Sequence, residues 1–260
     1  MSRLSKMNKT MKNTFKFMCI IVMVVAFLFM LNTCFNSNTK KQKVDMSEVD
    51  LVQLDALEDN IEEGQPIAII TTSLGEIRAV LYPEIAPNTV QNFIDLANSG
   101  YYDGTYIFRV QQDTYFAGGS ANKNGDLNQD FKEENELVEN EISEDLWPFK
   151  GAFMSLSAKK GCSGSRFIVI DSVEFTDDFK NELLSIYQDE ENNDTRLADA
   201  FIKYGGAPNV SQQWTIFAQT YQGFDVIEKI CSQKVEDEEN YQPTSDIIIE
   251  KVEISTYSKD

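Results

Sequence analysis

The chain has 260 residues, enough for one sizeable hydrophobic core with appendages, and its apolar content of 42% is ordinary for a globular domain. Its net charge of −19 is unusual, and because the first 44 residues hold eight Lys or Arg and no acid, the other 216 carry −27. So large a negative charge argues against nucleic acid as a partner. The chain contains no histidine, which excludes Ser-His-Asp triads, Cys-His dyads and most catalytic zinc sites. Solubility at a charged cell surface explains the acidity, and selection of basic client proteins is the alternative.

The amino terminus has the pattern of an export signal. Five basic residues between Arg3 and Lys16 precede the uninterrupted apolar run from Phe17 to Leu31. This run is short for a membrane-spanning helix, which needs about twenty residues. The positive flank is expected to stay in the cytoplasm and to place the rest of the chain outside. Residues 1–34 are therefore predicted to be an export signal or membrane anchor.

The end of this run carries a possible lipidation site. The sequence from Leu31 to Cys34 resembles the bacterial lipobox, in which the cysteine becomes the lipidated first residue of the mature protein. Thr33 departs from that pattern, because Gly, Ala or Ser usually precedes the cysteine. A lipoprotein, an uncleaved signal anchor and simple secretion remain the three alternatives. All three place the following domain outside the cytoplasmic membrane.

Residues 35–64 are predicted to be a polar, acidic linker, with a short helix around Val49–Leu57. Its expected role is to extend the domain away from the membrane or wall. Of the remaining cysteines, Cys19 lies in the apolar run and behaves as a small apolar residue. Cys162 and Cys231 show no metal-type spacing; a disulfide between them is conceivable, but a fold that needs no covalent staple favours free thiols.

The first half of the domain begins with two strands within Pro66–Leu81, joined by a tight turn at Ser73–Gly75. Apolar residues then recur at helical spacing after Pro87, and Gly100 is a plausible stop. A turn leads into a strand over Thr105–Val110. Strict two-residue alternation predicts that Ile107 and Arg109 share one face of this strand, so that Arg109 lines an outer groove rather than the core.

The second half begins with a polar loop over residues 120–141, whose spacing fails the EF-hand pattern. Further strands are predicted over Gly151–Ala158, Ser165–Ile170, Trp214–Thr220 and Asp246–Ser255. A helical insert with an acidic middle spans Phe175–Tyr204, and a second helix follows residue 224. Many short strands with two helices indicate a mainly β fold, and we find no internal repeats.

Six motifs stand in a recognisable order and spacing: Ile67–Ile77, Pro83–Gly100, Tyr101–Gly104, Tyr106–Gly119 with its arginine, Gly164–Ile168 and Trp214–Gln219. Together they make the chain resemble the cyclophilins, the peptidyl-prolyl cis-trans isomerases, and most closely their secreted or surface-anchored bacterial branch. The resemblance covers a domain at residues 65–257. It implies a closed antiparallel β-barrel capped by two α-helices, here with the helical insert, in a monomer that acts on proline-containing segments.

The resemblance implies that Arg109 is the catalytic arginine; the structural alternative is an ion pair with one of the many acids. Amide rotation needs no nucleophile, metal or cofactor, so none is expected. The substrate-binding positions that the resemblance implies are Tyr115, Ala117, Ser157, Ala158, Arg166, Ile168, Val210 and Trp214. The pair Ser157–Ala158 assumes a following loop that is one residue short; without that gap the pair is Leu156–Ser157.

Several of these positions depart from the family pattern. Thr114 stands in place of the pocket phenylalanine, Ala117 in place of a glutamine, and Arg166 in place of another glutamine. Losing an oriented hydrogen bond beside the arginine reduces the stabilisation of the transition state. The sequence therefore predicts a weak extracytoplasmic isomerase that assists the folding of exported proteins. The alternative is a catalytically impaired module that binds proline-containing segments of surface proteins.

Overall fold

The computed structural model describes residues 46, 49–125, 137–159, 161–187, 194–236 and 240–259. The chain divides into two units, residues 1–43 and 44–260, and every described residue belongs to the second. The predicted export signal, with Cys34, lies outside the described residues. No helix in the described ranges combines the length and apolar character that crossing a membrane requires.

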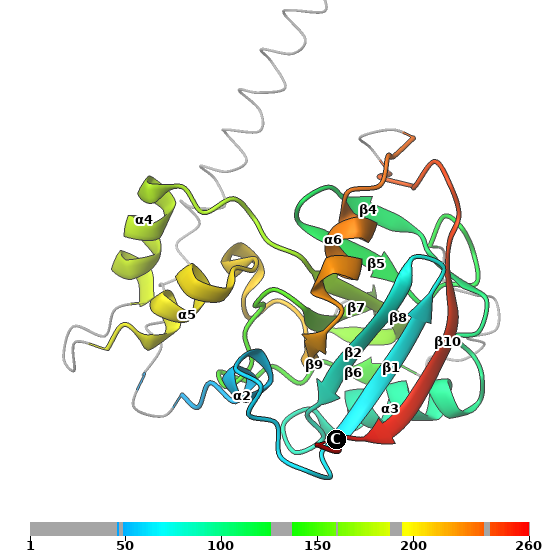
Figure 1. The fold of residues 1–260 in the computed structure, drawn as a ribbon, viewed down its shortest axis with the longest axis horizontal. Helices are drawn as coiled ribbons and strands as arrows, with labels where there is room; N and C mark the ends of the chain where they lie inside the picture. Colours follow the sequence, from blue (N-terminus) through cyan, green and yellow to red (C-terminus); the bar gives the residue numbers. More distant parts are fainter. Residues whose placement is uncertain are drawn as a thin grey trace, which may run out of the picture. The chain divides into compact units, whose positions relative to one another are not determined.

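The described part of the chain is dominated by a ten-stranded antiparallel sheet (Figure 1). The strands follow one another in the spatial order β3-β10-β1-β2-β9-β7-β8-β5-β4, and β6 pairs with β8. Their bounds are β1 Pro66–Thr72, β2 Gly75–Leu81, β3 Thr105–Ile107, β4 Arg109–Gln111, β5 Tyr115–Gly118, β6 Val138–Glu139, β7 Ala152–Lys159, β8 Cys162–Ile170, β9 Ile216–Gln222 and β10 Ile247–Thr256. Tyr106 on β3, at one end of this order, pairs with Ser120 just after β5, which is next to last at the other end, so the sheet forms a nearly closed barrel.

Two helices, α3 and α6, cover the barrel, as predicted. The described α-helices are α2 Gln53–Leu57, α3 Pro87–Asn98, α4 Asp177–Tyr187, α5 Arg196–Tyr204 and α6 Phe224–Cys231, with a 3₁₀ turn, η3, at Pro208–Val210. Helix α3 packs beside β8 and β10, whereas α6 packs beside β2, β4 and β5. Both helices bury apolar side chains in the barrel interior, including Val90, Phe93, Ile227 and Ile230. Burial of these side chains in one shared core is the main force that holds the helices on the barrel.

The strands separate two apolar layers by two-residue alternation. In β1, Ala68 and Ile70 point into the barrel interior, while Ile67 and Ile69 belong to an outer layer. The outer layer is covered by loops and by α2, so the strands are apolar on both faces. It is this outer layer that carries the candidate site.

The arginine strand is interrupted, which corrects one expectation. Strand β3 ends at Ile107 and β4 begins at Arg109, with Phe108 between them. Ile107 and Val110 both lie in the interior cluster, whereas Phe108 lies in the outer one. Ile107 and Arg109 therefore do not share a face, because alternation fails across the interruption. The inference that Arg109 faces outward is nevertheless confirmed, since it lines an outer cavity.

The hairpin of β7 and β8 is longer than predicted. The predicted strands Gly151–Ala158 and Ser165–Ile170 leave residues 159–164 as a loop between them. In the structure β7 reaches Lys159 and β8 begins at Cys162, and Ser157 pairs with Ser163 and Lys159 with Cys162. The pairing register shifts between Ser155 and Ser157 and between Ser157 and Lys159. Bulges of this kind interrupt the alternation of apolar and polar residues, so the sequence carries no signal for this part of the hairpin. The two helices α4 and α5 confirm the helical insert. Cys162 and Cys231 both carry free thiols, and burial raises the pKa of Cys231.

The segment ahead of the barrel differs from the predicted free tether. The short helix is present as α2, but Met46, Val49 and Leu51 are buried in a third apolar cluster with α4 and α5. Gln53 is fully buried, and its amide donates to Trp147 O and to Gln219 Oε1, both at 2.9 Å. The apolar residues in this acidic run find their partners almost 150 residues further along the chain. The domain boundaries 1–34, 35–64 and 65–257 themselves stay a prediction.

Candidate functional site

A cavity of about 300 Å³ lies against the outer face of β4, β5, β7 and β8 and the segment that follows α5. Most of its lining is aliphatic or aromatic. The lining residues are Arg109, Gln111, Thr114, Tyr115, Ala117, Met154, Leu156, Ile168, Ile170, Ala207, Asn209, Val210 and Trp214. A concave, mainly apolar site with a few polar groups is the usual form of a ligand-binding pocket.

The floor of the cavity is a row of side chains that runs across four strands. Arg109 on β4 lies opposite Ala117 on β5, which lies opposite Ile168 on β8, which lies opposite Met154 on β7. Because directly paired residues project to the same face of a sheet, these four side chains form one continuous surface. The row places a single cation at the edge of an apolar platform.

The guanidinium of Arg109 has no hydrogen-bond or ion-pair partner among the described residues. Its Nε is buried and makes no hydrogen bond, and the side chain forms no ion pair with any carboxylate in the described part of the chain. The structure thus does not show the ion pair that was the structural alternative for Arg109. Burying an arginine nitrogen without a partner is costly, so the arrangement is stabilised when a ligand supplies an acceptor.

The buried carboxylate of Asp171 forms an ion pair with Lys150. Asp171 follows β8 directly after the cavity residue Ile170, and its carboxylate lies 3.1 Å from Lys150 Nζ, which also lies 2.6 Å from Glu228 Oε1. Burial raises the pKa of Asp171 in spite of the ion pair with Lys150. The backbone N–H of Asp171 donates to Thr114 O at 2.8 Å, which fixes the turn between β4 and β5.

The wall that faces the floor comes from the segment after α5. Ala207 N donates to Pro148 O at 2.9 Å, and Val173 N donates to Gly206 O at 3.0 Å. Gly206 has a φ of 130°, and a side chain there would run into the Pro148 carbonyl. Glycine is therefore required where the wall crosses the barrel.

Six of the predicted site residues meet in this cavity: Arg109, Tyr115, Ala117, Ile168, Val210 and Trp214. Their individual roles remain predictions. Arg166, Ser157 and Ala158 lie further along β7 and β8 and are not part of the lining. The guanidinium of Arg166 donates to the backbone carbonyls of Ser157, at 3.0 Å, and Gly125, so it is held by the main chain rather than pointed into the cavity.

Several lining residues were not singled out from the sequence. Gln111 follows Arg109 by two residues on the same strand, so alternation alone places it on the same face. Met154 and Ile170 follow from the same rule once the strand pairing is known. Asn209 carries no such signal, because it lies in the 3₁₀ turn η3 after α5, where two-residue alternation does not apply.

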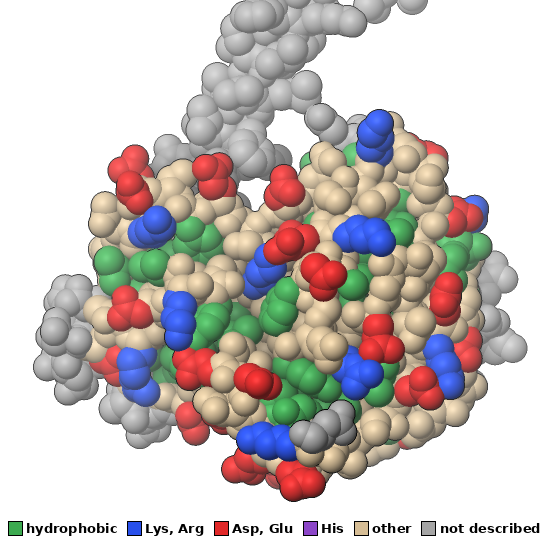
Figure 2. Space-filling model, in the orientation of Figure 1, with side chains coloured by type: hydrophobic (Ala, Val, Ile, Leu, Met, Phe, Trp, Pro, Cys, Tyr) green, Lys and Arg blue, Asp and Glu red, His purple; other side chains and the backbone are tan. Residues whose placement is uncertain are grey.

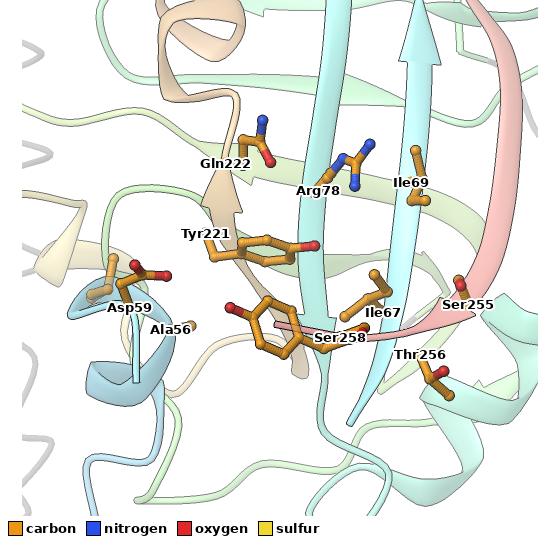
Figure 3. Close-up of a pocket in the computed structure, with 12 residues that line it drawn as sticks. Ala56, Asp59, Ile67, Ile69, Arg78, Tyr221, Gln222, Ser255, Thr256 and Ser258 are labelled. Carbon is orange, nitrogen blue, oxygen red and sulfur yellow. The ribbon is translucent and has the colours of Figure 1, made fainter. Parts of the chain in front are cut away.

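A larger hollow, of about 540 Å³, lies on a different part of the barrel surface (Figure 3). It is bounded by α2, by β1, β2 and β9, and by the end of β10, and Tyr221 points toward Arg78 within it (Figure 3). The Nε of Arg78 lies 2.8 Å from Glu76 Oε1, and this hydrogen bond raises the pKa of the Arg78 guanidinium. On the face shown in Figure 2, hydrophobic side chains gather in the region of the hollow and charges of both signs surround them.

The family model described as "Cyclophilin type peptidyl-prolyl cis-trans isomerase/CLD" matches residues 67–254. The chain is 29% identical over 198 residues, 76% of its length, to a Staphylococcus haemolyticus protein named as a candidate peptidyl-prolyl cis-trans isomerase, of which it covers 96%. It is 31% identical over 191 residues to a Streptococcus pyogenes protein named as a candidate bifunctional phosphatase and isomerase. That match takes in 73% of this chain but only 38% of the longer protein.

Solved structures show the same fold. A cyclophilin-type isomerase of Cryptosporidium parvum, crystallised in the presence of the dipeptide Ala-Pro, aligns with a TM-score of 0.52 at 18% identity, covering 74% of this chain and 99% of that one. A second structure of the same parasite protein aligns with a TM-score of 0.53, also at 18% identity, covering 76% of this chain and 99% of that one.

Proposed function

The chain belongs to the cyclophilin-type peptidyl-prolyl cis-trans isomerase family, and from this premise we propose that it isomerises proline-containing segments of exported proteins with Arg109 as the catalytic cation. One observation carries the assignment of the site. The Arg109 guanidinium, which has no hydrogen-bond partner for its Nε among the described residues, lies at the edge of an apolar cavity on the outer face of the sheet.

The reaction is a rotation and not a bond cleavage. Resonance between the carbonyl and the prolyl nitrogen sets a barrier of about 20 kcal/mol, so the uncatalysed change takes tens to hundreds of seconds. As the amide twists, the nitrogen becomes pyramidal and its lone pair becomes available to a donor. A protein accelerates the rotation when it binds this twisted form more tightly than either planar form.

The cavity supplies what this rotation requires. The apolar row formed by Ala117, Ile168 and Met154 gives the proline ring a surface from which water is excluded. The Arg109 guanidinium at its edge is placed to donate to the prolyl nitrogen as the lone pair appears. In a cavity that excludes water, such a donor stabilises developing charge more strongly than it would in bulk solvent.

We further propose that the activity is weak. Ala117 lies directly opposite Arg109 and offers no side-chain hydrogen bond to orient the guanidinium. One oriented hydrogen bond is worth on the order of a hundredfold in rate at comparable sites. The same observation favours a second candidate function, in which the domain binds proline-containing segments of surface proteins without accelerating their isomerisation.

A protease-coupled assay on a proline tetrapeptide tests the isomerase. The full-length chain in detergent is expected to accelerate the cis-trans change, and Arg109→Ala is expected to abolish the acceleration. Equal rates for the wild type and Arg109→Ala would exclude Arg109 as the catalytic cation. Binding of the tetrapeptide without any acceleration would support the second candidate.

We also propose that the domain is monomeric and works outside the cytoplasmic membrane, held there by the amino-terminal segment. The basic residues ahead of the apolar run Phe17–Leu31 and the cysteine at position 34 support this location. Metabolic labelling with a palmitate analogue is expected to label the wild type and to leave Cys34→Ala unlabelled. An unlabelled wild-type protein that still sediments with membranes would instead identify an uncleaved anchor.

A further inference from the structure

Gln111 is the second polar group that the arginine strand presents to the cavity. Strand β4 contains three residues, and Val110 between Arg109 and Gln111 is buried in the barrel interior. Arg109 and Gln111 therefore share the outer face, and both line the cavity. Their Cα atoms are about 6.5 Å apart along the strand, close to the length of one dipeptide in an extended peptide.

The main chain of Gln111 is fixed, whereas its side chain is unengaged. Gln111 pairs with Tyr115 across the β4–β5 ladder, and its carbonyl accepts the Thr114 N–H at 3.1 Å. Its amide makes no hydrogen bond within the described part of the chain. A primary amide offers two donors and an acceptor, and none of the described residues uses them here.

Other lining residues can also form hydrogen bonds, but none of them lies on β4 beside the guanidinium. Thr114, Tyr115 and Trp214 carry hydroxyl or indole N–H groups, whereas Met154, Ile168 and Ile170 are apolar. Asn209 is the other amide in the lining, but it is exposed and lies on the opposite wall. Gln111 is thus the amide that shares a rigid strand with the guanidinium.

Rotation about a prolyl bond imposes a requirement that the guanidinium alone does not meet. The peptide must stay bound in the cavity while one flank turns, and hydrogen bonds to the backbone N–H or C=O groups of the other flank hold it there in the planar and twisted forms alike. The carbonyl and NH₂ groups of a glutamine are spaced to accept and donate at once along an extended chain. We propose that Gln111 binds the backbone of the substrate beside the proline and so holds one flank while the other turns.

This inference rests on the proposed function, because it assigns Gln111 to the substrate of that same cavity. Gln111 binds both the planar and the twisted peptide, so its loss weakens binding without altering the rotation step. Two neutral hydrogen bonds in such a site correspond to roughly a tenfold change in affinity. Gln111→Leu is therefore expected to raise KM about tenfold and to leave kcat within twofold of the wild type.

The neighbouring Gln112 provides a matched control. It is exposed at the turn and is not part of the cavity lining. The experiment compares the wild type, Gln111→Leu, Gln111→Asn and Gln112→Leu as full-length chains in detergent. The protease-coupled assay gives kcat and KM, and titration with the proline tetrapeptide is followed by the NMR signals of the side-chain amides.

The expected result is a raised KM for Gln111→Leu, a smaller rise for Gln111→Asn, no change for Gln112→Leu, and a shift of the Gln111 NH₂ signals during titration. An unchanged KM with unmoved Gln111 signals, in a protein that still depends on Arg109, would overturn this inference and leave the proposed function intact. If the wild type shows no catalysis, the proposed function fails, and the titration still decides whether Gln111 contacts the peptide. Absence of any peptide binding would overturn both.

Discussion

Two arginines face two hollows on the barrel, and the difference between them identifies the site. Arg78 lines the larger hollow, where it pairs with Glu76 at 2.8 Å and keeps a side-chain exposure of 37%. Arg109 lines the smaller cavity and has a buried Nε without a partner. The Arg78 guanidinium is thus paired within the protein, whereas the Nε of Arg109 has no partner among the described residues. The proposed function therefore selects the smaller of the two hollows.

The environment of each arginine follows from its position in the sheet. Arg78 lies two residues from Glu76 on the same strand, so alternation gives the cation an acid on its own face. Arg109 has Gln111 at the equivalent distance and Ala117 across the ladder. Neither neighbour can neutralise a charge. The strand sequence itself therefore keeps one guanidinium paired and the other available.

After the loss expected for Arg109→Ala, the largest effect on catalysis comes from changing the shape of the Arg109 cation while keeping its charge. Lysine is a compact point charge without the planar fork of donors that a guanidinium provides. Arg109→Lys is expected to lower kcat/KM by about a hundredfold, which corresponds to about 2.7 kcal/mol of transition-state stabilisation. The protease-coupled assay measures this change. A Lys variant as active as the wild type would mean that charge alone suffices.

Helix α2, which borders the Arg78 hollow, allows a test of stability apart from catalysis. Its first residue, Gln53, is buried; its side-chain carbonyl accepts the Trp147 N–H, and its side-chain NH₂ donates to Trp147 O and Gln219 Oε1. Gln53→Ala leaves these groups unsatisfied and is expected to reduce the free energy of unfolding by about 2 kcal/mol. Urea denaturation measures the loss. An unchanged midpoint would contradict the anchoring role of Gln53.

The same variant tests whether the region around the Arg78 hollow influences catalysis at the Arg109 cavity. Ala56 and Leu57 of α2 line the hollow around Arg78 but not the cavity around Arg109. Gln53→Ala is therefore expected to keep its kcat/KM within about twofold of the wild type under conditions where it remains folded. A large loss of activity in the folded variant would show that the two regions are coupled.

A gain of function tests the reason given for weak activity. Ala117 lies opposite Arg109, so a glutamine there would bring an amide beside the guanidinium. Ala117→Gln is expected to raise kcat/KM about tenfold, the equivalent of about 1.4 kcal/mol. Ala117→Leu is the matched control, since it adds similar bulk without hydrogen-bonding groups. If both variants behave alike, orientation of Arg109 does not limit the rate.

The smallest expected effect is that of pH on catalysis. No carboxylate is among the described residues that line the Arg109 cavity, and the chain contains no histidine. Arginine and tyrosine side chains ordinarily keep one protonation state from about pH 6 to pH 9. The value of kcat/KM is therefore expected to stay constant across this range. A bell-shaped profile would reveal an acid or base that acts on catalysis from outside the cavity lining.

Much of the fold could be predicted from the sequence because its signals are local. The hairpin at Pro66–Leu81 follows from alternation and a turn, and α3 follows from helical spacing between a proline and a glycine. The interruption at Phe108 was not predictable in this way. It depends on how β3 and β4 pair with distant strands, and an aromatic residue fits either apolar layer.

The candidate site was predictable to the extent that single strands define it. Arg109, Ala117 and Ile168, which the resemblance implied as site positions, all line the cavity. Asn209 was missed, because tertiary contacts of the insert decide where it lies. The burial of Met46 and Val49 was missed for the same reason. From sequence alone, an acidic segment with few apolar residues is predicted to be exposed to solvent. Only the folded structure shows the surface that buries those apolar side chains.

The central claim is that an unengaged guanidinium, rather than a larger hollow, marks the active site. NMR exchange spectroscopy of a proline tetrapeptide tests it most directly, with the full-length wild type, Arg109→Ala and Arg78→Ala added in equal amounts. The account predicts wild-type exchange between cis and trans signals for Arg78→Ala and the uncatalysed rate for Arg109→Ala. Faster exchange that survives in Arg109→Ala and disappears in Arg78→Ala would contradict it.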